Sequence, residues 1–178
     1  MANKRSKTSK EDKLLNRASK ESLYSICNAY DALRPFFEVG IGAVKKSERK
    51  FIQVPDTSRL GGSVNLDEAA KSNFPHDNRW DYAIEYDKNL FLIEIHPAST
   101  SEIDCIISKV QFVTKWLKTN VPEILNLPKK EAKEREFYWV SSGKTDLRIA
   151  PGSRQAKRLA INHIKAVGKT WDYSKLFK

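Results

Sequence analysis

The sequence lacks the features that mark secreted, disulfide-bonded and membrane-spanning proteins. Of its 178 residues only two are cysteines, Cys27 and Cys105, and each lies in a segment with apolar periodicity. We therefore expect two reduced core residues, not a disulfide or a metal site. No apolar run approaches the roughly 18 residues that span a bilayer, and residues 1–13 contain no apolar stretch of the secretory type. These absences favour a cytoplasmic protein that has no membrane partner.

Positive charge, by contrast, is plentiful and lies mainly at the two ends of the chain. The net charge is +10, with +5 in residues 1–20, −2 in residues 21–143 and +7 in residues 144–178. Basic ends suit a polyanion such as nucleic acid. A solubilising tail and an ordinary charged helix face explain the same charges equally well, so charge alone leaves both interpretations open.

The length allows one domain with a real core and little room for a second. Residues 1–12 are polar and rich in lysine and serine, which predicts a disordered basic tail. Residues 13–178 then form a single domain. Apolar residues at helical spacing predict a first helix from Glu11 to Leu33, which Pro35 ends.

Strands dominate the next part of the chain. Apolar runs at residues 36–44 and 51–54 predict two strands joined by a charged turn. Residues 55–78 predict a long loop with one helical turn at Asp67–Lys71. The segment 80–98, WDYAIEYDKNLFLIEIHPA, predicts a tight β-hairpin.

Two further helices and one strand are predicted after the hairpin. An apolar stripe predicts a helix from the capping residues 99–101 to Lys118, residues 137–140 predict a short buried strand, and residues 151–167 predict a last helix. On the last helix four basic residues share one face, and His163 is expected in the core on the opposite face. His76 is expected at the surface. The four basic residues are Arg154, Lys157, Arg158 and Lys165.

This order of elements predicts an α/β fold of the mixed α+β kind. Helices at both ends and in the middle would flank one central mixed sheet of about four to five strands.

The predicted hairpin carries charged residues where core residues are expected. Side chains on a strand alternate between faces, so Asp81, Glu94 and His96 share one face whether the loop is Asp87-Lys88 or Lys88-Asn89. Directly opposed residues have Cβ atoms roughly 4.5–5.5 Å apart. The acids of the two strands are therefore expected to meet.

Two adjacent carboxylates repel each other unless a cation or a proton intervenes. Mg²⁺ is commonly held by one or two carboxylates together with water and substrate phosphates, so a hard-cation site accounts for this pair. The alternative is that this face of the hairpin is exposed to solvent and that the acids are ordinary polar positions. Helices predicted on both sides of the sheet argue for the cation site.

The element order, with Asp81 opening one strand and Glu94-Ile95-His96 on the next, resembles the PD-(D/E)XK nuclease superfamily over roughly residues 11–143. The resemblance implies a restriction-endonuclease-like core. It also implies that Asp81 and Glu94 bind Mg²⁺ or Mn²⁺, with the Ile95 carbonyl as a further ligand. Trp80 stands where the family has proline, and His96 stands where it has the motif lysine.

The family's lysine sometimes lies on the following helix, where this chain has Lys109, and an acid on the first helix often joins the site, where it has Glu21. The resemblance thus implies a divergent Mg²⁺-dependent nuclease that hydrolyses phosphodiester bonds, with His96 or Lys109 assisting water activation. The basic residues of the last helix would hold DNA or RNA. A non-catalytic nucleic-acid-binding module and a protein-assembly module stay open as alternatives, as does a homodimer or a larger complex.

Overall fold

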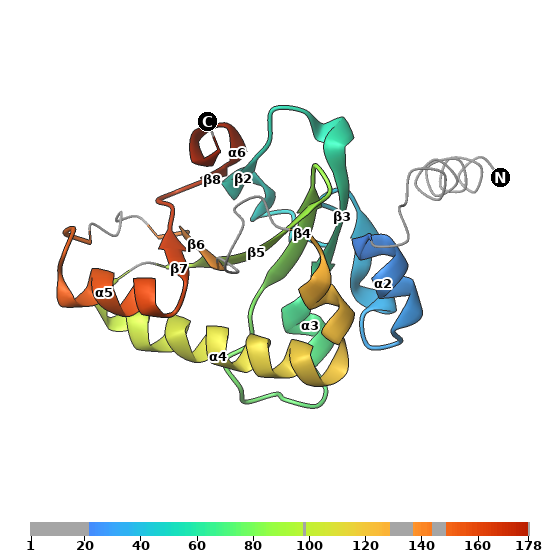
Figure 1. The fold of residues 1–178 in the computed structure, drawn as a ribbon, viewed down its shortest axis with the longest axis horizontal. Helices are drawn as coiled ribbons and strands as arrows, with labels where there is room; N and C mark the ends of the chain where they lie inside the picture. Colours follow the sequence, from blue (N-terminus) through green and yellow to red (C-terminus); the bar gives the residue numbers. More distant parts are fainter. Residues whose placement is uncertain (1–21, 98, 129–136, 144–148, 178) are drawn as a thin grey trace.

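The computed structural model describes residues 22–97, 99–128, 137–143 and 149–177 (Figure 1). These residues form a sheet of six strands in the order β1-β3-β4-β5-β6-β7. Neighbours from β1 to β5 are antiparallel, whereas β5–β6 and β6–β7 are parallel. The strands are β1 (Phe37–Val39), β3 (Leu60–Asn65), β4 (Tyr82–Tyr86), β5 (Asn89–His96), β6 (Phe137–Ser141) and β7 (Ile164–Ala166).

Helices cover one face of this sheet, and a smaller layer covers the other (Figure 1). The smaller layer contains α6 and a separate parallel pair of strands, β2 (Ile52–Gln53) and β8 (Trp171–Asp172). The α-helices are α2 (Leu23–Ala29), α3 (Leu66–Lys71), α4 (Ile103–Asn120), α5 (Arg154–Ile161) and α6 (Tyr173–Leu176). Short 3-10 helices are η1 (Arg34–Phe36), η2 (Arg49–Phe51), η3 (Thr57–Arg59), η4 (Thr100–Glu102) and η5 (Pro122–Asn126).

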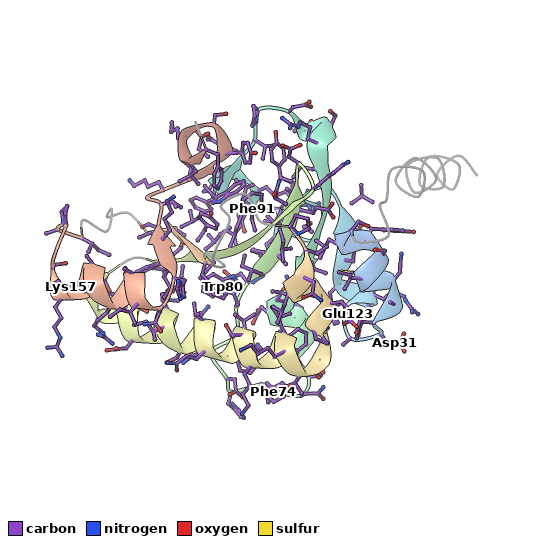
Figure 2. The ribbon with its side chains drawn as sticks, in the orientation of Figure 1. Asp31, Phe74, Trp80, Phe91, Glu123 and Lys157 are labelled. Atoms are coloured by element: carbon purple, nitrogen blue, oxygen red, sulfur yellow. The ribbon has the colours of Figure 1, made fainter. Side chains whose placement is uncertain are left out.

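The predicted fold class is confirmed: a central mixed sheet lies between flanking elements, with six strands where about four to five were predicted. Both faces of the sheet are buried. Trp80 and Leu92 belong to the core beneath the helices, and Phe91 and Ile93 belong to the core on the other side (Figure 2). Strand β5 therefore carries apolar side chains on both faces, as expected for a strand covered on both sides.

The hairpin adopts the first of the two predicted registers. Tyr86 pairs with Asn89, so the loop is Asp87-Lys88. Both loop residues have positive φ, 51° and 62°, which a two-residue turn needs to match the twist of its strands.

The predicted long loop proved wrong, because residues 60–65 form β3 between β1 and β4. This strand contains Gly61 and Gly62, which carry no strand propensity. Close packing explains why residue 62 is a glycine, because a Cβ there would lie 2.4 Å from the Phe37 ring. The first strand is shorter than predicted because the chain turns at Gly40, where φ is +66°.

The predicted last helix is also wrong beyond Ile161. The chain turns at His163, whose φ is 55°, and then enters β7. His163 is consequently exposed instead of buried in the core, and Lys165 lies on a strand instead of the helix face. Leu159 is the buried anchor of α5.

The remaining predictions agree in part with the structure. Helix α4 lies where predicted and buries its apolar stripe, His76 is exposed, and Cys27 is a buried free cysteine. The described part of the first helix ends at Ala29 instead of Leu33. The predicted basic tail, the start of that helix and Glu21 lie outside the described residues. Among the described helices none has the length and apolar character needed to cross a membrane.

The turn gives a stability prediction. We expect Lys88→Gly to raise the free energy of unfolding by about 0.5–1 kcal/mol, because glycine adopts positive φ without the cost that a side chain incurs. Urea denaturation measures the change. Lys115→Gly on the exposed side of α4 is the matched control and should lose about 1 kcal/mol. Equal losses in both variants would contradict the turn geometry.

Candidate active site

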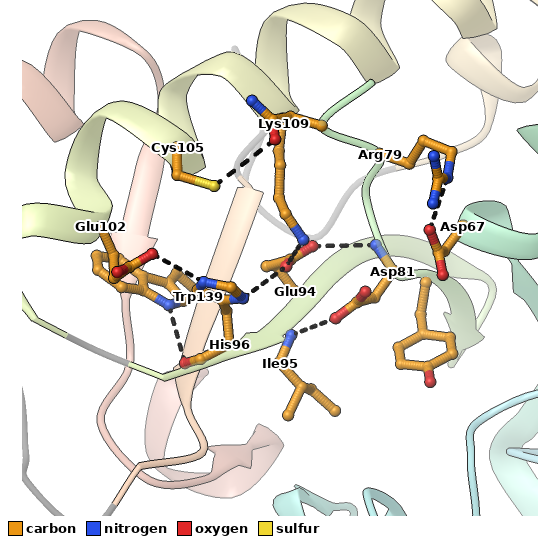
Figure 3. Close-up of polar contacts among 12 residues, drawn as sticks. Asp67, Arg79, Asp81, Glu94, Ile95, His96, Glu102, Cys105, Lys109 and Trp139 are labelled. Atoms are coloured by element: carbon orange, nitrogen blue, oxygen red, sulfur yellow. Dashed lines mark hydrogen bonds and ion pairs between the residues drawn. The ribbon is translucent and has the colours of Figure 1, made fainter. Parts of the chain in front are cut away.

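The carboxyl end of β5 gathers the charged residues that the sequence singled out (Figure 3). Glu94 and His96 lie at the end of this strand, and Asp81 immediately precedes β4. Lys109 reaches the same place from α4. The structure thus brings together all four residues predicted to be catalytic.

Asp81 and Glu94 are linked through the backbone of each other's strand. The Asp81 N–H donates to Glu94 Oε2 at 3.0 Å, and the Ile95 N–H donates to Asp81 Oδ2 at 2.9 Å. These bonds extend the hairpin by one position beyond the Tyr82–Ile93 pair. The Glu94 side chain is 0% exposed, so the alternative of a solvent-exposed face is wrong.

Lys109 supplies the positive charge next to this pair. Its ammonium forms an ion pair with Glu94 Oε1, and its side chain is largely buried. Burial alone would lower the pKa of Lys109, but the charges of Glu94 and Asp81 outweigh burial and the pKa is raised. The lysine is therefore charged, and its charge partly opposes the effect of burial on Glu94.

Burial dominates the protonation of both acids. It raises the pKa of Glu94 to about 8; the charge of Asp81 raises this pKa as well, while Lys109 lowers it. Burial also raises the pKa of Asp81, against the opposing effect of Lys109. Carboxylates of this kind hold a proton or a cation near neutral pH.

The oxygen donors here suit a hard cation. Asp81 Oδ1 has no hydrogen-bond partner among the described residues, whereas both Glu94 oxygens are engaged. The Ile95 carbonyl lies on the Asp81 side of β5, because the N–H and C=O of a strand residue point to the same neighbour. Two carboxylates and a carbonyl are ligands that Mg²⁺ and Mn²⁺ accept.

His96 connects this pair to a second group of side chains. Its Nε2 lies 3.0 Å from Glu102 Oε2, and its Nδ1 lies 3.9 Å from Glu94 Oε1. Cys105 lies beside them as a free, half-buried cysteine, so the prediction of a buried core residue is wrong for this residue. Glu102, Cys105 and Lys109 follow one another at i, i+3 and i+7, a spacing that could have placed them on one helix face.

A third group approaches Asp81 from the other side, from a segment in which the sequence indicates only a charged turn. Glu48 forms a hydrogen bond with the Tyr82 hydroxyl, which also accepts the Lys45 N–H at 3.3 Å. The charge of Glu48 raises the pKa of Asp81, and Lys45 lowers it. No spacing in the sequence links this turn to the hairpin.

The basic residues predicted to bind nucleic acid do not form one helix face. Arg154 and Lys157 are exposed on α5, and Lys157 points away from the body of the protein (Figure 2). Arg158 forms an ion pair with Asp104 of α4. Lys165, on β7, is half-buried.

The raised pKa of Glu94 predicts how stability changes with pH. Folded Glu94 keeps its proton up to about pH 8, whereas the unfolded residue loses it near pH 4.5. The folded state then binds more protons in this window, so the free energy of unfolding falls as pH rises, by at most about 1.4 kcal/mol per unit. Glu94→Gln should flatten this slope in urea denaturation, while Glu68→Gln keeps it. Equal slopes in wild type and Glu94→Gln would contradict the burial effect.

Comparisons with known proteins gave no relative, so a function is assigned from this geometry. No protein-family model, no curated protein and no solved structure matched the chain.

Proposed function

We propose that the chain is a divergent metal-dependent nuclease-fold domain that hydrolyses phosphodiester bonds of nucleic acid. The observation that carries the proposal is the pairing of Asp81 with the buried Glu94, together with the contact of Lys109 with Glu94 (Figure 3). Its arrangement of an acid opening one strand, an acid on the next and a lysine from the following helix resembles the PD-(D/E)XK pattern stated above.

In this proposal Asp81, Glu94 and the Ile95 carbonyl hold Mg²⁺ or Mn²⁺. A bound ion of this kind lowers the pKa of water and neutralises charge that develops on a phosphodiester. Lys109 takes the place of the motif lysine and orients the attacking water beside Glu94. His96 borders the same space, with its Nδ1 3.9 Å from Glu94 Oε1, and an imidazole nitrogen there is the candidate base.

Nucleic acid would be held by the exposed basic residues of α5. The ion pair between Arg158 and Asp104 connects this helix to α4, which also carries Lys109. Arg154 and Lys157 remain exposed to contact phosphates. A cytoplasmic location forms part of the proposal, and the two free cysteines suit it.

The second candidate is a nucleic-acid-binding module without catalysis. One observation favours it: Lys109 already contacts Glu94, so a metal is not needed to place a positive charge beside the acids. This module would bind nucleic acid equally well with Mg²⁺ or with a chelator.

A cleavage assay on the full chain tests the leading proposal. We expect single- or double-stranded DNA or RNA to be cut with Mg²⁺ or Mn²⁺ and not with EDTA. Asp81→Asn and Glu94→Gln should each lower the rate by about 10²-fold or more. The matched control is Glu85→Gln, a buried acid at the far end of β4 that accepts the Leu23 N–H at 2.7 Å, and it should cut normally.

Cleavage that persists undiminished in both site variants would assign the activity to a contaminant and overturn the proposal. Binding without any cleavage would support the second candidate. Circular dichroism of each variant confirms that loss of activity is not loss of fold.

Salt dependence tests the nucleic-acid surface separately. Removing one side chain that binds a phosphate should reduce the slope of log affinity against log salt by about one. We expect this reduction for Lys157→Ala and for Arg154→Ala. Lys118→Ala, which removes an exposed lysine from the far end of α4, should keep the wild-type slope. An unchanged slope in both α5 variants would show that α5 does not contact the polymer.

A further inference from the structure

Three potential metal ligands converge beside the acid pair. His96 ends β5, Glu102 ends η4, and Cys105 lies in the first turn of α4. One ligand atom from each lies within 4.8 Å of those from the other two. These atoms are an imidazole nitrogen, a carboxylate oxygen and a thiol sulfur, which are three different types of metal ligand.

The separations are close to those of a metal centre. Bonds of about 2.0–2.3 Å to a tetrahedral ion place neighbouring ligand atoms roughly 3.3–3.8 Å apart. His96 and Glu102 already approach to 3.0 Å. The ligand atoms of all three residues lie within 4.8 Å of one another, so an ion would draw them together by about 1 Å at most.

The mixed donor set decides the class of ion. Sulfur and imidazole ligands favour Zn²⁺ and ions of similar character such as Co²⁺, whereas Mg²⁺ prefers oxygen alone. Three protein ligands leave the fourth tetrahedral position open, as in catalytic zinc sites. The side chains of His96 and Glu102 are 28% and 34% exposed, so solvent can reach that position.

The second ring nitrogen of His96 faces a carboxylate, as it does in many metal-ligating histidines, although at a distance longer than a hydrogen bond. Such histidines usually direct their second ring nitrogen at a carboxylate or carbonyl, which fixes the ring. Here Nδ1 lies 3.9 Å from the buried Glu94 carboxylate while Nε2 faces Glu102. The His96 carbonyl accepts the Ser142 N–H at 3.2 Å and the Trp139 indole N–H at 3.3 Å, which anchor the strand end (Figure 3).

We propose that His96, Glu102 and Cys105 bind one Zn²⁺-class ion with an open fourth position, next to and distinct from the oxygen site at Asp81 and Glu94. This inference does not depend on the proposed nuclease activity. It shares His96 with that proposal but assigns it a ligand role, which would leave water activation to Lys109. The two proposals can fail separately because one is read from cleavage and the other from metal–thiolate absorption.

Cobalt provides a direct readout, because a thiolate bound to Co²⁺ produces a charge-transfer absorption that carboxylates and imidazoles do not. The full chain would be stripped with EDTA and titrated with Co²⁺. We expect the thiolate band to saturate at a single ion per chain, and added Zn²⁺ to abolish it. Cys105→Ala should remove the band, and His96→Gln should weaken Co²⁺ affinity by at least about 10-fold.

Two controls locate the ion. Cys27→Ala removes the other cysteine, which is buried in the core beneath the helices, and should leave the band intact. Asp81→Asn alters the oxygen site and should also leave it intact. A band that survives Cys105→Ala, or saturable Co²⁺ binding without a thiolate band, would overturn the inference. So would the absence of any Co²⁺ binding by wild type.

Discussion

Burial of the Glu94 carboxylate is the constraint on which the arrangement of this protein depends. A buried charge is costly unless it is paired and hydrogen-bonded, and Glu94 obtains both from different parts of the chain. The Asp81 N–H comes from the start of β4, and the Lys109 ammonium comes from α4. Removing one partner of such a pair typically costs about 3–5 kcal/mol. The hairpin register and the docking of α4 are therefore linked through one side chain.

The same constraint explains why the site is open to two functional interpretations. Lys109 and a divalent cation would both neutralise the acids, and both favour the deprotonated form of Glu94. A metal can be retained only if its favourable interactions with Asp81 and the Ile95 carbonyl outweigh the interaction free energy that is lost when Lys109 moves away from Glu94. A phosphate group on bound nucleic acid would change this balance, because it offers Lys109 another anion. The ligand thus decides between a structural ion pair and a metal site.

The sequence could predict contacts that follow from strand alternation and from helical periodicity. Strand alternation placed Asp81, Glu94 and His96 on one face in either hairpin register. The apolar stripe predicted the helix that carries Lys109, and the family resemblance singled that lysine out. It could not predict β3, because Gly61 and Gly62 are selected by close contacts instead of strand propensity. The end of α5 was missed because a positive φ at His163, and no proline or glycine, turns the chain. Pairing of β7 with β6 is a long-range contact that no local pattern encodes.

Helix α4 unites the features that the hairpin alone does not explain. Glu102, which directly precedes this helix, and Cys105 and Lys109 in its first two turns lie near the end of β5. Asp104, between them in the sequence, pairs with Arg158 of α5. Side chains at i, i+3 and i+7 share one face of a helix, whereas Asp104, two positions after Glu102, lies on another face. Helix α4 therefore positions Cys105 and Lys109 beside the acid pair, and it contacts the basic helix through an exposed ion pair that contributes little to stability. A shift of α4 along its axis would move Lys109 relative to Glu94, so the docking of this helix on the sheet sets the electrostatics of the acid pair.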